Sequence, residues 1–310
     1  MNSIDTAENT SAPDHCKVAL AQYPVDYFET IAEFREKLEH WVKTAASEGA
    51  QLLLFPEYAA MELCSLLDKP LQNDLQGQLQ AMQAYLPLFL ETHQQLAQQY
   101  QVTLVAGSFP VKIPSPEQPE HTIYVNRSHV IHPDGRIDFQ DKQIMTRFET
   151  EEWGISPGTG IKVISTAVGK IGISICYDSE FPLIARRQIE LGADFILVPS
   201  VTETLAGYYR VRTGSQARAL ENQCYVLHAP LVGEAPWSPA VDVNVGRAGV
   251  YTPMDKGLPD DGVMVIGELN QQGWIYATLD KTLLQNVRHD GHVLNHRDWA
   301  LQATRTDATG

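Results

Sequence analysis

Short, almost wholly apolar runs recur along this chain of 310 residues and alternate with longer stretches of helical periodicity. Such runs, bounded by polar or turn-forming residues, predict strands. Apolar residues spaced three and four apart predict helices over about 28–48, 76–100, 180–191 and 205–222. Strands that are apolar at nearly every position are typical of sheets covered by helices, so the sequence predicts an α/β fold. The predicted strands are Val18–Val25, Gln51–Phe55, Val102–Ala106, Tyr124–His132, Val163–Ser165, Ile171–Ile175, Asp194–Pro199, Cys224–Ala229, Ala248–Tyr251 and Trp274–Leu279.

A single domain is predicted over residues 16–299, because strand and helix patterns continue without a linker. The Pro-rich segment Pro114–Pro119 indicates a surface loop, since strand patterns resume on both sides of it. Asp134 and Gly135 form a hairpin-turn signal. Residues 1–15 are predicted to be a disordered N-terminal tail, and residues 300–310 a C-terminal tail.

Net charge and cysteine content limit the partners and the compartment. The formal charge of −15 argues against a nucleic-acid or anionic-membrane partner, because it would repel both. The four cysteines are widely separated and contain no CxxC pair, which favours a reducing compartment over a disulfide framework. The first 15 residues lack the basic start and apolar stretch of a signal peptide, and no run approaches 18 apolar residues. We therefore expect a cytoplasmic protein.

Cys176 follows the apolar run Ile171–Ile175 and precedes a predicted helix. The unpaired backbone N–H groups of a helix start would favour a thiolate, which is the reactive form of cysteine. A cysteine at the end of a buried strand can therefore be a nucleophile. From this segment alone, a buried residue that only packs is equally possible.

Two further side chains follow apolar strands in the same way. Glu57 comes after Pro56, where burial would raise the carboxyl pKa and suit a general base. Lys142 follows the second strand of the predicted hairpin and would be an oxyanion donor if it were buried beside Glu57. Taken singly, a glutamate in the position of Glu57 is more often a helix N-terminal carboxylate, and a lysine in that of Lys142 is usually a solvated surface residue. Glu149 follows seven residues after Lys142 and could keep the lysine protonated.

These segments together resemble the nitrilase superfamily of carbon–nitrogen hydrolases. The resemblance is carried, in order, by Pro56-Glu57, by Asp141-Lys142 and by Cys176-Tyr177-Asp178 with Phe181-Pro182. Collinear matches run from about Val18 to Asp298. The second glutamate of the family falls most naturally on Glu149, with Glu151 and Glu152 as alternatives. The resemblance implies a four-layer α-β-β-α sandwich, no cofactor and no metal.

The chemistry implied by the resemblance is hydrolysis of a linear, non-peptide carbon–nitrogen bond in a small molecule. Cys176 would attack the amide carbon and form a thioester, while Glu57 takes the thiol proton and later protonates the departing ammonia. Lys142 and the backbone N–H of Tyr177 would stabilise the oxyanion. Tyr-Asp after the cysteine resembles the amidase side of the family. Hydrolysis of an N-carbamoyl compound or a nitrile stays open, as do acyl transfer to an amine and an inactive binding protein.

Substrate contacts are expected from Tyr177, Ser200 and Thr202, and from loops such as Met61–Leu67. The helix segment Tyr208–Arg210 could bind a carboxylate or an aromatic group, or could pack at a subunit interface. The resemblance also implies a homodimer or a larger homo-oligomer. Three histidines near the C-terminus resemble a polar tail more than a metal site: His289, His292 and His296.

Overall fold

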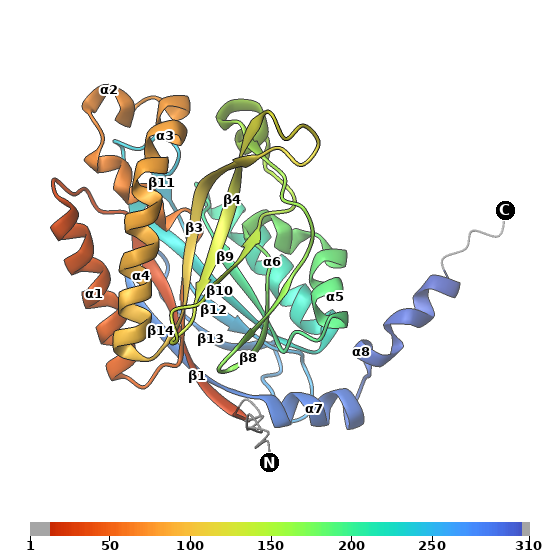
Figure 1. The fold of residues 1–310 in the computed structure, drawn as a ribbon. Coiled ribbons are helices and arrows are strands. Elements are labelled where there is room, and N and C mark those ends of the chain that lie inside the picture. Colours follow the sequence, from red (N-terminus) through yellow and green to blue (C-terminus); the bar gives the residue numbers. More distant parts are fainter. Residues whose placement is uncertain (1–12, 306–310) are drawn as a thin grey trace, which may run out of the picture.

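Two sheets packed face to face form the centre of the molecule, with helices on both outer faces (Figure 1). This computed structural model describes residues 13–305. The first sheet has the order β5-β4-β3-β2-β1-β14, and the second has the order β7-β8-β9-β10-β12-β13. They join where β1 and β10 pair, at Tyr23 with Leu231 and Pro24 with Val232. The predicted four-layer α-β-β-α sandwich is confirmed.

The first sheet contains seven strands, including the short β6 beside β4. They are β1 (His15–Pro24), β2 (Leu52–Phe55), β3 (Thr103–Pro114), β4 (Thr122–Ile131), β5 (Ile137–Asp141), β6 (Ile155–Ser156) and β14 (Gly273–Asp280). The second sheet, with the short β11 at the end of β10, contains β7 (Val163–Thr166), β8 (Gly169–Ile173), β9 (Phe195–Ser200), β10 (Tyr225–Glu234), β11 (Val243–Asn244), β12 (Gly249–Tyr251) and β13 (Val263–Ile266).

Helices α1, α3 and α4 cover the first sheet, and α5 and α6 cover the second. The α-helices are α1 (Ile31–Ser47), α2 (Lys69–Gln72), α3 (Leu75–Met82), α4 (Leu86–Tyr100), α5 (Pro182–Glu190), α6 (Leu205–Asn222), α7 (Lys281–Asp290) and α8 (Asn295–Asp298). Single-turn and 3-10 segments are Ala59–Leu66, Gln83–Tyr85, Cys176–Glu180 and Trp299–Thr304, and Phe148–Trp153 is a π-helix. No helix within residues 13–305 is long and apolar enough to cross a bilayer.

The central strands are apolar at consecutive positions because both of their faces are buried. In β1, Val18 and Leu20 point into the space between the sheets, while Ala19 and Ala21 contact the helix layer. In β2, Leu54 faces the other sheet and Leu53 faces the helices. Successive side chains of a strand point to opposite faces, so a strand between two apolar layers needs no polar position.

The predicted helix over 76–100 is interrupted. It forms α3, the 3-10 turn Gln83–Tyr85 and α4, and Pro87 lies in the first turn of α4. A proline has no N–H to donate and its ring clashes with the carbonyl four residues earlier, so it fits only at a new helix start. Strand β1 begins at His15, inside the predicted N-terminal tail, while residues 1–12 and 306–310 lie outside the described part of the chain.

Candidate active site

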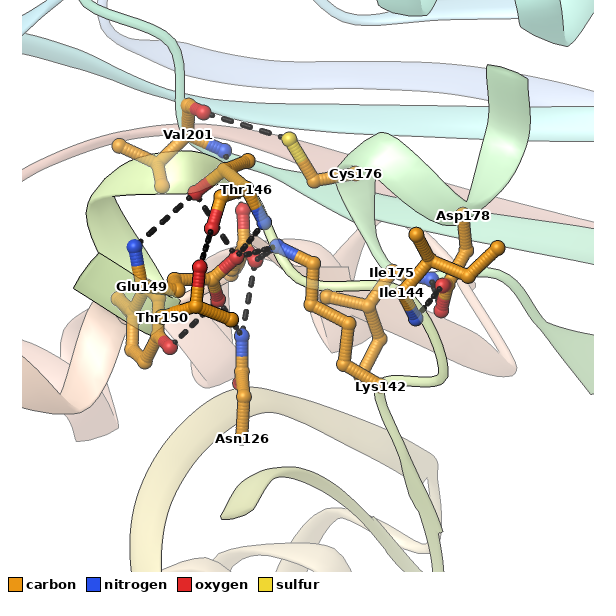
Figure 2. Close-up of polar contacts among 12 residues, drawn as sticks. Asn126, Lys142, Ile144, Thr146, Glu149, Thr150, Ile175, Cys176, Asp178 and Val201 are labelled. Atoms are coloured by element: carbon orange, nitrogen blue, oxygen red, sulfur yellow. Dashed lines mark hydrogen bonds and ion pairs between the residues drawn. The ribbon is translucent and has the colours of Figure 1, made fainter. Parts of the chain in front are cut away.

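The C-terminal ends of four strands meet at one edge of the two sheets. Glu57 follows β2, Lys142 follows β5, Cys176 follows β8 and Val201 follows β9. Ligands of α/β proteins usually bind at this edge, because the strand order places several loop residues together there. Figure 2 shows how the side chains converge.

Lys142 is the centre of this cluster and is 1% exposed. Its Nζ donates to Glu57 Oε1 at 2.8 Å and to Glu149 Oε2 at 2.6 Å. Asn126 Nδ2 bridges the same two carboxylates, at 2.8 Å from Glu57 Oε1 and 3.2 Å from Glu149 Oε1. The ammonium is therefore fixed between two charge-assisted hydrogen bonds.

Glu149, and neither of its acidic neighbours, is the carboxylate that reaches Lys142. Besides the lysine and Asn126, it accepts from Tyr58 OH at 2.8 Å and from the Thr146 backbone N–H at 2.9 Å. Glu151 pairs with the exposed Arg147 instead. The π-helix directs Glu149 inward.

Glu57 and Cys176 are connected through Val201. The Val201 N–H donates to Glu57 Oε2 at 3.0 Å, and Cys176 Sγ donates to the Val201 carbonyl at 3.4 Å. Cys176 adopts φ +48°, a left-handed conformation at the start of its 3-10 helix. This sharp turn directs the sulfur toward the side of Glu57 that Lys142 and Asn126 leave open.

Burial and charge together set the protonation states. Burial raises the pKa of Glu57, although Lys142 partly offsets this. Burial also raises the pKa of Glu149, but the Lys142 charge and the hydrogen bonds from Lys142 and Thr146 outweigh it and hold the value below the usual range. Burial lowers the pKa of Lys142, but Glu149 and Glu57 outweigh it and hold the value well above the usual range. The lysine is a permanent cation and Glu57 a poised base.

The resting state of the sulfur differs from the sequence expectation. Burial, and then the Glu57 charge, raise the pKa of Cys176 well above its usual value. The helix start was expected to favour a thiolate, but the 3-10 helix there is only five residues long and the sulfur is desolvated beside a carboxylate. Cys176 therefore rests as a thiol, and an attack by its sulfur would require a base.

Asp178 connects the loop after Lys142 to the loop before Cys176 through hydrogen bonds, a role that the sequence analysis missed. Its carboxylate accepts from the backbone N–H groups of Ile144 at 2.9 Å, Gln143 at 3.2 Å and Ile175 at 3.1 Å. The first two follow Lys142, and the third precedes Cys176. Desolvation raises the pKa of this carboxyl to about 7.

A cavity of about 230 Å³ opens beside the sulfur and is lined in part by Tyr177 and Thr202. Ser200, the third expected substrate contact, does not line it: the side chain is fully buried and its Oγ lies 2.7 Å from His228 Nε2. Successive residues of β9 point to opposite faces, which directs Ser200 into the core. The segment Met61–Leu67 is also absent from the lining. Arg210 lines the cavity, whereas Tyr208 is buried and Tyr209 faces solvent.

Asn126 and Tyr58 are the site residues that sequence reasoning missed. Asn126 is an unremarkable polar residue within β4. Tyr58 adjoins Glu57, and its adjacency was the only available signal. Within residues 13–305 no group of three or more His, Cys, Asp or Glu side chains is arranged to hold a metal ion.

Comparison with known proteins agrees with the geometry. A family model described as carbon-nitrogen hydrolase matches residues 17–283. A Bacillus subtilis protein described as probable hydrolase YhcX is 32% identical over 283 residues, covering 91% of this chain and 53% of that protein. The chain thus spans about half the length of YhcX. Deaminated glutathione amidase of Mus musculus is 26% identical over 294 residues, covering 91% of this chain and 81% of the relative.

Solved structures show the same fold. Saccharomyces cerevisiae Nit3, described as a member of branch 10 of the nitrilase superfamily, superposes with a TM-score of 0.68 at 22% identity, covering 90% of this chain and 96% of Nit3. A carbon-nitrogen hydrolase from Helicobacter pylori gives 0.71 at 18% identity, covering 94% and 96%. The chain belongs to the carbon–nitrogen hydrolase family, the nitrilase superfamily.

Proposed function

We propose that this hydrolase cleaves a linear amide of a small molecule through a thioester on Cys176 and releases ammonia. The arrangement of Glu57 and Lys142 around the Cys176 turn carries the proposal. A buried thiol with a raised pKa needs a base, and Glu57 is a desolvated carboxylate whose Oε2, the oxygen that Lys142 does not contact, is held by the Val201 N–H beside that turn. Amidase relatives support the amide over other carbon–nitrogen bonds.

Acylation begins when Cys176 Sγ attacks the amide carbon and its proton passes to the Glu57 carboxylate. The carbonyl electron pair moves to oxygen, which accepts hydrogen bonds from Lys142 Nζ and the backbone N–H of Tyr177. An N–H in the first turn of a 3-10 helix has no partner within that helix, so it is available to an oxyanion. Collapse of the tetrahedral species transfers the Glu57 proton to nitrogen, and ammonia leaves.

Deacylation reverses the same proton path. Glu57 takes a proton from water as the oxygen attacks the thioester carbon. The carbon–sulfur bond then breaks, and the Glu57 proton passes to Sγ, which gives the acid, the free thiol and the ionised base. Lys142 keeps its charge throughout, because its pKa is held well above the working range. Glu149 holds the lysine in place and does not exchange protons in this scheme.

Ammonia release from a panel of aliphatic amides, ω-amides, N-carbamoyl amines and nitriles tests the proposal. We expect turnover of amides by the natural chain and a loss of about 10⁴-fold or more in Cys176→Ala. Intact mass after rapid quenching should show an acyl adduct on Cys176, and added hydroxylamine should divert it to a hydroxamate. Equal ammonia release by the natural chain and Cys176→Ala would contradict the proposal. Selective turnover of carbamoyl compounds or nitriles would move the activity to another member of the family.

A further inference from the structure

Charges of mainly one sign line the cavity that contains the sulfur. Two of its charged side chains are cationic, Lys142 and Arg210. Four are carboxylates: Glu57, Glu149, Glu180 and Glu203. The lining therefore has a net charge of −2 when all are ionised, and stays negative if Glu57 carries a proton. The whole chain has the same sign, at −15. A cleft lined by one sign of charge concentrates ligands of the opposite sign.

Arg210 does not reverse this sign, because Glu180 already compensates it. Arg210 Nε lies 3.3 Å from Glu180 Oε1, and Glu180 ends the 3-10 helix that starts at Cys176. One turn along α6, a Cβ on Gly214 would lie 2.7 Å from the Ser179 carbonyl oxygen, and Arg218 Nη1 donates to that carbonyl at 3.1 Å. Residues spaced by four share one helix face, so this face of α6 ties the helix to the nucleophile's turn.

Glu203 is the one carboxylate of the cavity lining that has no cationic partner among the described residues. Glu57 and Glu149 share Lys142, and Glu180 has Arg210. Glu203 is exposed to solvent and lines the same cavity, and within residues 13–305 it makes no hydrogen bond or ion pair. It lies between Val201, which contacts the nucleophile, and the start of α6.

Apolar side chains complete the lining. Phe148 and Val211 belong to it, as do Val241 and Val243 of the segment before β12. An aliphatic chain in contact with them would lose apolar surface to water, which favours binding. The cavity thus offers the sulfur, apolar walls and an uncompensated carboxylate.

We infer that the substrate is an amide whose other end carries a protonated amine, joined by a short aliphatic spacer, and that Glu203 is the carboxylate that meets the amine. This inference rests on the proposed amidase function and adds the charge of the substrate to it. Arg210 instead connects α6 to the 3-10 helix that begins at Cys176, through its ion pair with Glu180.

Three amides of matched length test the charge. They are 5-aminopentanamide (cationic), hexanamide (neutral) and the monoamide of adipic acid (anionic). We expect kcat/KM for the cation to exceed that for hexanamide by about fivefold or more, with the anion lowest, and the preference to shrink as salt is added. In Glu203→Gln the ratio of cationic to neutral kcat/KM should fall toward one. Glu36→Gln, an exposed change of the same charge on α1, should keep the natural ratio.

A second measurement works without turnover. Iodoacetamide alkylates an accessible cysteine, and peptide mapping distinguishes Cys176 from the three other cysteines. Butylammonium should slow alkylation of Cys176 in the natural chain and do so less in Glu203→Gln, while butanoate should have no effect.

The outcomes separate the two proposals. Faster turnover of the adipic monoamide, or protection by butanoate alone, would overturn the inference and make Arg210 an anion site. Equal turnover of all three amides with an unchanged ratio in Glu203→Gln would overturn it too, while the amidase function stands. If no amide releases ammonia but butylammonium alone protects Cys176, the amidase proposal fails and the charge preference of the cavity is retained.

Discussion

At the scale of single residues, the site depends on which groups hold protons. In the proposed mechanism Glu57 receives the thiol proton, because Lys142 and Asn126 occupy one carboxylate oxygen and leave the other near the Val201 backbone and the sulfur. Lys142 cannot serve as the base, because two carboxylates keep it charged. In this proposal one desolvated carboxylate performs the proton transfers for which other thiol enzymes use a histidine.

The pH dependence of catalysis follows from these shifts. We expect kcat/KM to rise with pH as Glu57 loses its proton, with a midpoint above the usual 4.5 because burial raises its pKa. Lys142 should add no alkaline limb up to about pH 10, since its pKa is held well above 10.5. A pH profile of ammonia release measures this, with Glu57→Gln as the inactive control. A midpoint at or below 4.5, or a loss of activity near pH 8, would contradict the assignment.

At the scale of elements, the loops after β5 and β8 are joined by one side chain. Asp178→Asn keeps the shape but presents an NH₂ group to backbone N–H donors. We expect it to lower the free energy of unfolding by about 2 kcal/mol and to reduce kcat through displacement of Lys142.

The cost of Asp178→Asn should also depend on pH. The native pKa of about 7 lies above the unfolded value of 3.8, so the native state binds more protons between them and the natural chain loses stability as pH rises through that range. The free energy of unfolding of the variant does not fall in this way. The difference in free energy of unfolding between the natural chain and Asp178→Asn should therefore be larger at pH 5 than at pH 8. Urea unfolding at both pH values measures it. A deficit that is the same at pH 5 and pH 8 would contradict the raised pKa and mean that the carboxyl is ionised throughout this range.

Strand β3 supports the end of β2 through a close backbone approach. Gly107 has φ +67°, and a Cβ there would lie 2.1 Å from the Pro56 carbonyl oxygen, next to Glu57. We expect Gly107→Ala to cost about 3 kcal/mol and to lower kcat more than tenfold by moving Glu57. Gly49→Ala is the matched control, because Gly49 has φ +81° with no atom near its Cβ position.

Thermal unfolding and kcat would be measured for both glycine variants. Gly49→Ala should cost only the backbone strain, about 1 kcal/mol, with kcat unchanged. Equal kcat in the two variants would show that the β3 approach does not position Glu57.

At the scale of the whole molecule, the two sheets stabilise each other through the apolar layer between them. Leu54 lies in this layer and is fully buried. We expect Leu54→Ala to lower the free energy of unfolding by about 3 kcal/mol, because the packed layers cannot close the cavity. Leu301→Ala, at a side chain 61% exposed in the segment Trp299–Thr304, should change it by less than about 0.5 kcal/mol. Denaturant unfolding measures the change in free energy of unfolding for both variants. Similar changes would contradict the claim that the apolar layer between the sheets stabilises the fold.

The exposed side chain of Leu183, on α5, suggests where copies of this chain could contact one another. It belongs to a set of large apolar side chains exposed on α5 and α6, with Leu191 just after α5. The expected homodimer or larger homo-oligomer remains a prediction, and this exposed set is where we would look for the contact. The other members are Leu205, Tyr209 and Leu220.

Much of the fold was predictable because its signals are local. Apolar runs marked the strands on both sheets, and turn residues marked their ends. Glu57, Lys142 and Cys176 stood out because each follows such a run, and the resemblance to a family placed them in one site. Tertiary structure was needed wherever the direction of a side chain mattered, as for Ser200, which lies at a strand end but points into the core.

Residue type and spacing are properties of the chain, so the α/β class and the strand ends could be predicted from them, and so could the hypothesis that Cys176, Glu57 and Lys142 share one site. Tertiary structure was needed to show that Glu149 is the carboxylate that reaches Lys142, that Asn126 and Tyr58 complete the cluster, and that Cys176 rests as a thiol. The reason is physical. Hydrogen-bond partners and desolvation depend on which distant segments pack together, and spacing along the chain does not contain that information.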